Sequence, residues 1–410
     1  MARKILIIAE YESLNGGERS LLAVLPYLKE AGWQLSVLLP KDEVLGATDV
    51  DRRLTESPGP AARSKPIEQN AALNLNEALS TMEIPTIRLA KFDKQGNRLT
   101  QTEMRSQIAG QLISDAPNLI HCNSLSTSRL CGPVARSFGI PAIGHLRDII
   151  KLSRRAIEDL NELSQIIAVS QATRDWHVNH GIAADRTVVI YNGVDLETFS
   201  PRCRPLVDHR TPDWRHTLHI DAAAPVLLFV GQIGLRKGID VLLAAFEMIA
   251  RVDSSCHLLI VGARNSLKEE AIVFETTLHD ATARSDVSPR IHWLSRRNDI
   301  PDLMRESTLL VHPARQEPLG RVLLEAAASG LPMITTNVGG SSEILAGMES
   351  WQLIQPVDAE LIAGRVLKLL QDEKQRLEIS RQLRQIAETR FSAESTAKAI
   401  SGIYLNWIPD

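Results

Sequence analysis

Short apolar runs alternate with longer amphipathic stretches along almost the whole chain. In the first half, runs typical of buried strands lie at residues 5–9, 35–39, 86–89, 119–121, 142–145, 166–169 and 188–191. Between most of them, apolar residues recur with helical period. In residues 18–29, for example, one face carries Leu21, Leu22, Leu25 and Leu28. The repeated order strand, helix, strand predicts a parallel sheet with helices on both sides.

The same pattern starts again in the second half. Strand-like runs lie at residues 226–230, 257–261, 291–294, 309–312 and 333–335, with helical stretches at 241–250, 267–283 and 322–329. After Val357 the pattern is helical, at residues 361–371, 374–389 and 393–406. The pattern therefore predicts an α/β protein made of two successive doubly wound, Rossmann-like domains.

The boundaries between these domains follow from the loss of periodicity. We expect a first domain over residues 1–195, a linker over 196–224 that is rich in proline, and a second domain over 225–390. The last helix, within 391–410, is expected to pack back on the first domain. Residues 46–65 are rich in Pro, Ser, Arg and Asp, which predicts a surface loop.

Composition narrows the class of protein. Lysine and arginine total 46 and aspartate and glutamate total 49, giving a net charge of −3, which argues against a general nucleic-acid binder. The four cysteines are scattered with no C-x-x-C pair, which disfavours a disulfide scaffold or a zinc site. The first apolar run is too short for a signal peptide, and none approaches a membrane span. These features together predict a cytoplasmic protein.

In doubly wound domains, ligands bind beyond the carboxyl ends of the strands, so we expect the residues of a binding site in the turns that follow the strands. The first such turn carries Gly16, Gly17 and Glu18 before a helix. Paired glycines let a ligand approach the backbone, although such a pair often only shapes a tight turn. Neither G-x-G-x-x-G nor G-x-x-x-x-G-K-[ST] occurs, which disfavours a nicotinamide dehydrogenase and a P-loop ATPase.

The corresponding turn of the second half combines glycines with two cations. Gly231, Gly234 and Gly238 surround the adjacent pair Arg236 and Lys237. A diphosphate suits this combination, because Arg binds two oxygens at once and Lys adds a compact charge. The alternative is a solvated loop with ordinary surface charges.

A third turn places two carboxylates eight positions apart. A strand ends at His312, Glu317 follows in a polar loop, and Glu325 lies in an otherwise apolar helix that begins near Gly320. A buried carboxylate needs a partner, either the diol of a sugar or a structural arginine. A second glycine pair, Gly339 and Gly340, precedes the next helix.

These motifs, in this order, resemble those of the family-4 retaining glycosyltransferases. The resemblance rests on Gly16 to Arg19, Tyr191 to Asp195, Gly231 to Gly238, the Glu317/Glu325 pair and Gly339-Gly340. It spans nearly the whole chain and is densest over 226–345. It implies the GT-B fold, in which two Rossmann-like domains face a cleft.

The resemblance also implies a donor site in the second domain for a nucleoside diphosphate sugar, with UDP- or GDP-sugars expected. Arg236 and Lys237 would bind the diphosphate, Glu325 the ribose hydroxyls and Glu317 the transferred sugar. The remaining donor-site residues that it implies are Gly231, Ser295, Arg296, Leu319, Gly320, Arg321 and Val322. Ser295 stands where the family often has Gly, and Ala314 where it often has Ser.

The implied reaction is a transfer with retention, by front-face attack and without a cofactor or metal, in a carbohydrate biosynthetic step. The residues expected to act in it are His145, Glu317, Arg236 and Lys237. The acceptor, which is a lipid carrier, a glycan or a small molecule, would be bound by Gly16, Gly17, Glu18, His121 and Arg147. The basic residues Arg147, Lys151, Arg154 and Arg155 fit contact with anionic lipid at a membrane or with a phosphorylated acceptor, although the pattern favours a solvated helix face.

Two other functions remain open at this point. A sugar-nucleotide epimerase shares the fold but needs no acceptor. An inactive sugar-nucleotide-binding subunit would keep the donor site without turnover. The Glu317/Glu325 pattern favours transfer.

Overall fold

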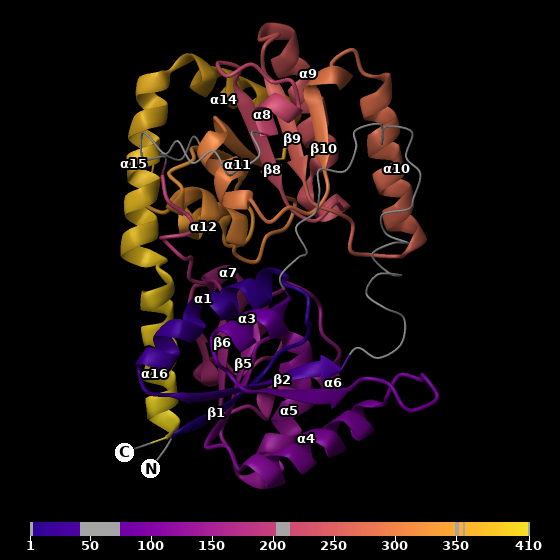
Figure 1. Cartoon of the computed structure of the whole chain (residues 1–410), viewed down its shortest axis with the longest axis vertical. Coiled ribbons are helices and arrows are strands. Elements are labelled where there is room, and N and C mark those ends of the chain that lie inside the picture. The colour runs from indigo at the N-terminus through magenta and orange to yellow at the C-terminus, as the bar shows by residue number, and fades with distance from the viewer. Residues whose placement is uncertain (1–2, 42–73, 202–213, 349–351, 356, 409–410) are drawn as a thin grey trace. The chain divides into compact units, whose positions relative to one another are not determined.

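The computed structural model describes residues 3–41, 74–201, 214–348, 352–355 and 357–408. Their contacts divide them into two compact units, one holding residues 3–41, 74–194 and 391–408, the other holding the described residues from 195 to 390 (Figure 1). The surface loop expected over 46–65 lies outside the described residues, as does the 202–213 part of the expected linker.

The first unit is built on a sheet of seven parallel strands. They are β1 (Lys4–Ile8), β2 (Gln34–Lys41), β3 (Thr86–Ala90), β4 (Leu119–Cys122), β5 (Ala142–Leu146), β6 (Gln165–Ala168) and β7 (Thr187–Val189). Their order is β3-β2-β1-β4-β5-β6-β7. The α-helices are α1 (Gly16–Glu30), α3 (Leu75–Thr81), α4 (Gln101–Asp115), α5 (Leu125–Phe138), α6 (Arg154–Asn161), α7 (Gln171–Asn179) and α16 (Ala393–Trp407).

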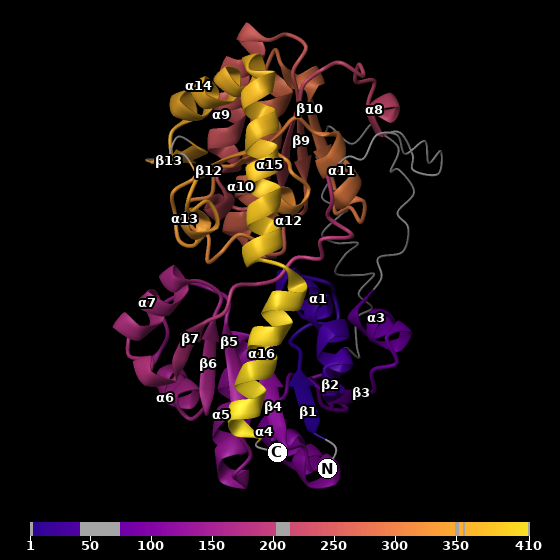
Figure 2. The same ribbon diagram turned by 90° about the vertical axis from the view of Figure 1, so that its left-hand side faces the viewer.

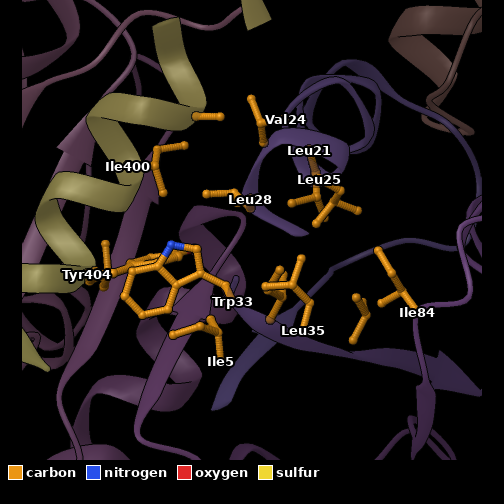
Figure 3. Packing of buried hydrophobic residues seen from close by; sticks show 14 of the residues in the cluster. Ile5, Leu21, Val24, Leu25, Leu28, Trp33, Leu35, Ile84, Ile400 and Tyr404 are labelled. Carbon is orange, nitrogen blue, oxygen red and sulfur yellow. The ribbon is translucent and has the colours of Figure 1, made fainter. Parts of the chain in front are cut away.

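Side chains of this sheet alternate between two cores, because successive residues of a strand point to opposite faces. On β1, Ile5 and Ile7 join the core beneath α1 and α16, which also includes Trp33 and Tyr404 (Figure 3). The residues between and after them, such as Leu6, join the core on the other face, formed with α4, α5 and α6. Both faces are buried, which explains why the strands read as continuous apolar runs.

The second unit repeats this design with six parallel strands. They are β8 (Val226–Val230), β9 (His257–Val261), β10 (Ile291–Leu294), β11 (Leu309–His312), β12 (Met333–Thr336) and β13 (Leu353–Ile354), in the order β10-β9-β8-β11-β12-β13. The α-helices are α8 (Trp214–Thr217), α9 (Ile239–Val252), α10 (Glu269–Arg284), α11 (Ile300–Glu306), α12 (Arg321–Ala328), α13 (Ser341–Ile344), α14 (Ala359–Gln371) and α15 (Glu373–Arg390) (Figure 2).

Both sheets therefore have the strand order of a Rossmann fold, and the expected doubly wound architecture is confirmed. In each, the order reverses once, between β1 and β4 in the first unit and between β8 and β11 in the second. Ligands bind such sheets at the carboxyl ends of the strands beside this reversal. A binding site is therefore expected beside β1 and β4 in the first unit and beside β8 and β11 in the second.

The strand β7 ends two residues earlier than the pattern predicts. We expected a strand over 188–191, but β7 ends at Val189. The chain then bonds to the start of α16 instead: the Tyr191 carbonyl accepts from Thr396 Oγ1 at 3.0 Å, and the Val194 N–H donates to the Phe391 carbonyl at 2.8 Å. A Cβ on Gly193 would lie 2.5 Å from the Cα of Ala393, so this close approach requires glycine.

Candidate functional site

In the second unit, the loops that follow β8 and β11 meet at the reversal of strand order. A short 3-10 turn, Leu235–Lys237, follows β8 and carries Arg236 and Lys237. Gly238 has a φ of +69°, and a Cβ there would lie 1.9 Å from the Pro313 carbonyl oxygen, so only glycine lets the loops approach. The Arg315 N–H also donates to the Arg236 carbonyl at 2.8 Å.

This contact brings Lys237 to Glu317. The Lys237 Nζ lies 2.5 Å from Glu317 Oε2, and the same oxygen lies 2.8 Å from His312 Nε2. Glu317 is 6% exposed and His312 is fully buried. Burial alone would raise the pKa of Glu317, but the Lys237 ammonium and the His312 hydrogen bond more than offset it and hold that pKa well below its ordinary value. Burial lowers the pKa of His312, so its neutral ring donates to an ionised carboxylate.

The helix that carries Glu325 starts directly after this loop. Gly320, with a φ of +99°, precedes α12, and no side chain caps its N-terminus. Leu319 and Gly320 are buried, whereas Arg321 and Val322 are partly exposed. The first turn of α12 is thus partly exposed, and the positive end of a helix dipole is a favourable position for an anion.

Glu325 itself has a protein partner. Arg321 Nε lies 2.7 Å from Glu325 Oε1, one helical turn away, and Glu325 is 7% exposed. The sequence allowed two kinds of partner for this carboxylate, a sugar diol or a structural arginine, and the structure shows an arginine, Arg321, bound to Oε1.

The other expected donor-site residues occupy the neighbouring strand ends. Gly231 follows β8, and its carbonyl would lie 1.9 Å from a Cβ on Gly262, so the loops after β8 and β9 are in close contact. Ser295 and Arg296 follow β10, two strands from the reversal, and both are exposed. The Arg296 guanidinium binds the side chain of Asn265.

In the first unit, the paired glycines form the first turn of α1. Among the described residues, and apart from its chain neighbours and its own helix backbone, no atom lies within 4 Å of a Cβ built on Gly16, and one built on Gly17 would lie 3.5 Å from Arg147 Cδ, an ordinary contact. Packing within this unit therefore does not require glycine at position 16. Glu18 is buried in the same turn, and burial raises its pKa.

Arg147 is held beside these glycines by two asparagines. Its Nε and Nη2 each lie 2.8 Å from Asn123, on the carbonyl and Oδ1 respectively, and its Nη1 lies 2.6 Å from Asn192 Oδ1. Asn123 is positioned by the turn after β4, where Ser124 caps α5. This network fixes the guanidinium at the carboxyl end of the sheet.

His121 and His145 lie on neighbouring strands, on the face covered by α1 and α16. Their rings stack with centroids 4.7 Å apart and 22° between planes. Together with Arg147 they line a small cavity of about 10 Å³. Burial, reinforced by Arg147, lowers the pKa of His121 to about 3 and holds that of His145 well below its ordinary value, so both rings are neutral near pH 7.

The part of the chain that the structure describes shows neither a membrane-spanning helix nor a metal-binding cluster. It contains no helix with the length and apolarity needed to cross a membrane. Within the same residues, no group of three or more His, Cys, Asp or Glu side chains is arranged to hold a metal ion.

Sequence reasoning missed the partners that hold these residues. His312 was noted only as the end of a strand, yet it binds Glu317 directly. Asn123 carried no signal beyond its position after β4. Tyr404, whose hydroxyl binds His121, stands 283 positions further along the chain, and nothing local in the sequence connects the two.

Two Rossmann-like units form the architecture of the GT-B class of glycosyltransferases. Residues 14–198 match the family model for Glycosyltransferase Family 4, and residues 211–386 match the model for Glycosyl transferases group 1. The chain therefore belongs to the family-4 glycosyltransferases of GT-B fold, as the motifs indicated.

Individual relatives agree with this assignment. The chain is 27% identical over 248 residues to spore coat protein SA of Bacillus subtilis, covering 60% of this chain and 66% of that protein. It is 30% identical over 223 residues to D-inositol 3-phosphate glycosyltransferase of Corynebacterium urealyticum, covering 53% and 51%. These alignments span about half to two thirds of each relative's length.

Solved structures share the fold along the whole chain. The crystal structure of Anabaena Alr3699/HepE in complex with UDP and glucose superimposes with a TM-score of 0.77 at 21% identity, covering 98% of this chain and 99% of that one. WaaG, a glycosyltransferase involved in lipopolysaccharide biosynthesis, gives a TM-score of 0.64 at 17% identity, covering 97% and 100%.

Proposed function

We propose that this protein transfers a sugar from a nucleoside diphosphate sugar to a hydroxyl acceptor, with retention of anomeric configuration and without a metal. The second unit would bind the donor and the first unit the acceptor. The observation that carries the proposal is the buried cluster of Lys237, Glu317 and His312 at the strand reversal of the second unit. The complex of Alr3699/HepE with UDP and glucose favours a UDP-sugar as donor.

The donor diphosphate would lie against Arg236, Lys237 and the N-terminus of α12. As the sugar leaves, negative charge develops on the diphosphate, and these two cations and the helix dipole would stabilise it. Lys237 is already fixed in place by Glu317 at 2.5 Å, so it loses little freedom when it binds the phosphate. Gly231, Leu319, Gly320, Arg321 and Val322 would complete the approach to the phosphates and sugar.

Glu317 would receive the transferred sugar. Lys237 and His312 both bind Oε2, so Oε1 would accept from a sugar hydroxyl. Because the carboxylate is ionised and held from one side, its other oxygen is oriented in advance.

Glu325 would bind the ribose diol while keeping its arginine. Arg321 contacts only Oε1 among the contacts described for Glu325, and a hydroxyl pair could donate to the carboxylate from its other side. Ser295 and Arg296, at the neighbouring strand end, would lie near the nucleoside.

In the first unit, the acceptor would lie over Gly16, Gly17 and Glu18, near His121 and Arg147. Open space above Gly16 supports this assignment, since the protein itself does not need glycine there. The acceptor hydroxyl oxygen would attack the anomeric carbon on the face that the diphosphate leaves, and a leaving phosphate oxygen would take its proton. Neutral His145 would orient the reacting groups through a hydrogen bond rather than through charge.

The test is product analysis with UDP- and GDP-sugars, first with donor alone and then with panels of lipid, glycan and polyol acceptors. We expect an acceptor-dependent glycoside whose anomeric configuration equals that of the donor. Rapid formation of an epimeric nucleotide sugar from donor alone would instead identify an epimerase. Tight nucleotide binding with neither product would identify a non-catalytic binding subunit.

A further inference from the structure

The C-terminal helix reaches the imidazole pair of the first unit through one tyrosine. Tyr404 of α16 is fully buried, and its hydroxyl hydrogen-bonds to His121 Nδ1. Its ring packs edge-on against Trp33, with centroids 5.2 Å apart and 87° between planes (Figure 3). The tyrosine therefore has an apolar environment around its ring and a single polar contact at its tip.

The direction of this hydrogen bond follows from the chemistry of a buried phenol. Burial raises the pKa of Tyr404, so the hydroxyl keeps its proton. His121 is the hydrogen-bond partner of that hydroxyl among the described residues, and an O–H buried without an acceptor would be costly. With the phenol as donor, only the Nε2–H of His121 is left without a partner among the described residues, whereas the reverse direction would leave both the phenol O–H and the Nε2 lone pair without one. The phenol therefore donates, His121 Nδ1 accepts, and the proton of the neutral His121 ring resides on Nε2.

His121 in turn supports the ring of His145. The two rings are stacked, and the described residues provide no hydrogen-bond partner for either nitrogen of His145, although both nitrogens are buried. The orientation of the His145 ring therefore depends on packing, and His121 forms one face of that packing. The cavity that both histidines line has about the volume that one water molecule needs, and it gives the unpartnered nitrogens a place to meet such a water.

We propose that Tyr404 is a positioning residue, which holds His121 in one tautomer and one ring plane and thereby fixes the orientation of His145. The role of His145 at the reacting centre rests on the function proposed above. The chain of contacts from Tyr404 to His145 does not, since it lies within the first unit and exists without substrate.

The first test is spectroscopic and independent of turnover. Nitrogen-15 spectra of the histidine rings in the full chain distinguish a protonated ring nitrogen from an unprotonated one. We expect the wild-type protein to show His121 protonated at Nε2, and Tyr404→Phe to give mixed tautomers and to shift the His145 signals. His121→Gln removes the imidazole that binds Tyr404 and stacks on His145, so it should shift the His145 signals too. A proton on Nδ1 of His121, or unchanged His145 signals in both variants, would overturn the proposal.

A matched control separates positioning from helix docking. Trp33 Nε1 donates to Ser401 Oγ at 2.8 Å, so Ser401→Ala removes one hydrogen bond of α16 without touching His121. We expect Tyr404→Phe to lower kcat about tenfold, as for a barrier raised by about 1.4 kcal/mol, with little change in the donor KM. Ser401→Ala should retain wild-type kcat. Equal losses in the two variants would mean that Tyr404 only docks the helix.

A wild-type protein without transfer activity would refute the proposed function, while the spectra would still decide the positioning role.

Discussion

Glu317 remains ionised although it is almost completely buried, and this depends on two side chains that bind one of its oxygens. Lys237 supplies a full charge at 2.5 Å and His312 a hydrogen bond at 2.8 Å. A buried carboxylate without such partners would take up a proton. The cluster therefore combines two properties that a donor site needs, a fixed cation and a fixed hydrogen-bond acceptor.

Removing the His312 donor should destabilise the second unit. His312→Phe replaces the buried imidazole with a somewhat larger apolar ring, and Glu317 loses one of its two partners. We expect a loss of about 1–3 kcal/mol in unfolding free energy. Urea unfolding followed by circular dichroism measures it, with His219→Asn as an exposed control. An unchanged midpoint in the His312 variant would show that the hydrogen bond contributes nothing.

The charge of Glu325 should matter for nucleotide binding more than for folding. Glu325→Gln keeps the size of the side chain but weakens its bond to Arg321 and to a ribose diol. We expect UDP affinity to fall about tenfold, which corresponds to ~1.4 kcal/mol. Glu378→Gln is the matched control, because Glu378 also pairs with an arginine on a helix of this unit. Equal UDP affinity for the two variants in calorimetric titration would argue for a purely structural Glu325.

At the level of elements, two helices start with glycine for different reasons. Gly320 precedes α12 with a φ of +99°, and a Cβ there would lie 2.8 Å from Leu323 Cδ1. Gly16 begins α1 with open space around it. The first glycine is required by the fold, whereas the packing described for the first unit does not require the second.

This contrast predicts opposite outcomes for the same substitution. Gly320→Ala should lower the stability of the second unit by about 1–3 kcal/mol, because it forces a strained backbone. Gly16→Ala should change stability by less than about 0.5 kcal/mol, yet weaken use of the acceptor. Thermal unfolding and initial rates at varied acceptor concentration measure the two effects. A destabilised Gly16 variant would remove the steric argument for an acceptor there.

Elements were largely predictable from the sequence because their apolar periods are strong. The parallel strands β8 and β9 begin and end where their apolar runs do. The exceptions are set by contacts distant in sequence: β7 stops because the backbone after Val189 bonds to the start of α16. The two-residue strand β13 is too short to leave a periodic signal.

The site was predictable only in part, for a related reason. Residues in turns after strands, such as Lys237 and Glu317, share an edge of the sheet by topology, so their proximity followed from the motif pattern. Arg321 and Glu325 stand four positions apart on α12, a spacing that allows the pair but does not dictate that it forms. We expected the last helix to pack back on the first domain, but no local pattern identifies His121 as the residue that its Tyr404 contacts there.

On the scale of the whole molecule, buried neutral histidines make stability depend on pH. Among the described residues, seven histidines have pKa values lowered chiefly by partial or complete burial, at positions 121, 145, 177, 257, 279, 292 and 312. In the unfolded chain their pKa returns to about 6.5. The unfolded state therefore binds more protons at acidic pH. These groups contribute their full stability above the unfolded pKa of about 6.5. Their contribution is lost as pH falls toward the pKa values in the folded protein, which is about 3 for His121.

Unfolding at pH 5 should consequently take up protons. Calorimetry in two buffers with different heats of ionisation measures the number. We expect His145→Gln to reduce the uptake by about one proton, because that ring is neutral when folded and charged when unfolded. The control His219→Asn removes an exposed imidazole. The same reduction in both variants, or none in the His145 variant, would contradict the neutral buried state of His145.

The central claim is that the cluster at the strand reversal of the second unit binds a nucleoside diphosphate. Calorimetric titration of UDP into the full chain tests it most directly, with Lys237→Met compared against Lys268→Met, a lysine of the same unit whose side chain is 77% exposed. The account predicts saturable binding by the wild-type protein and the Lys268 variant, and at least about tenfold weaker binding by the Lys237 variant. Equal affinity in all three proteins, or no heat with any nucleoside diphosphate, would contradict it.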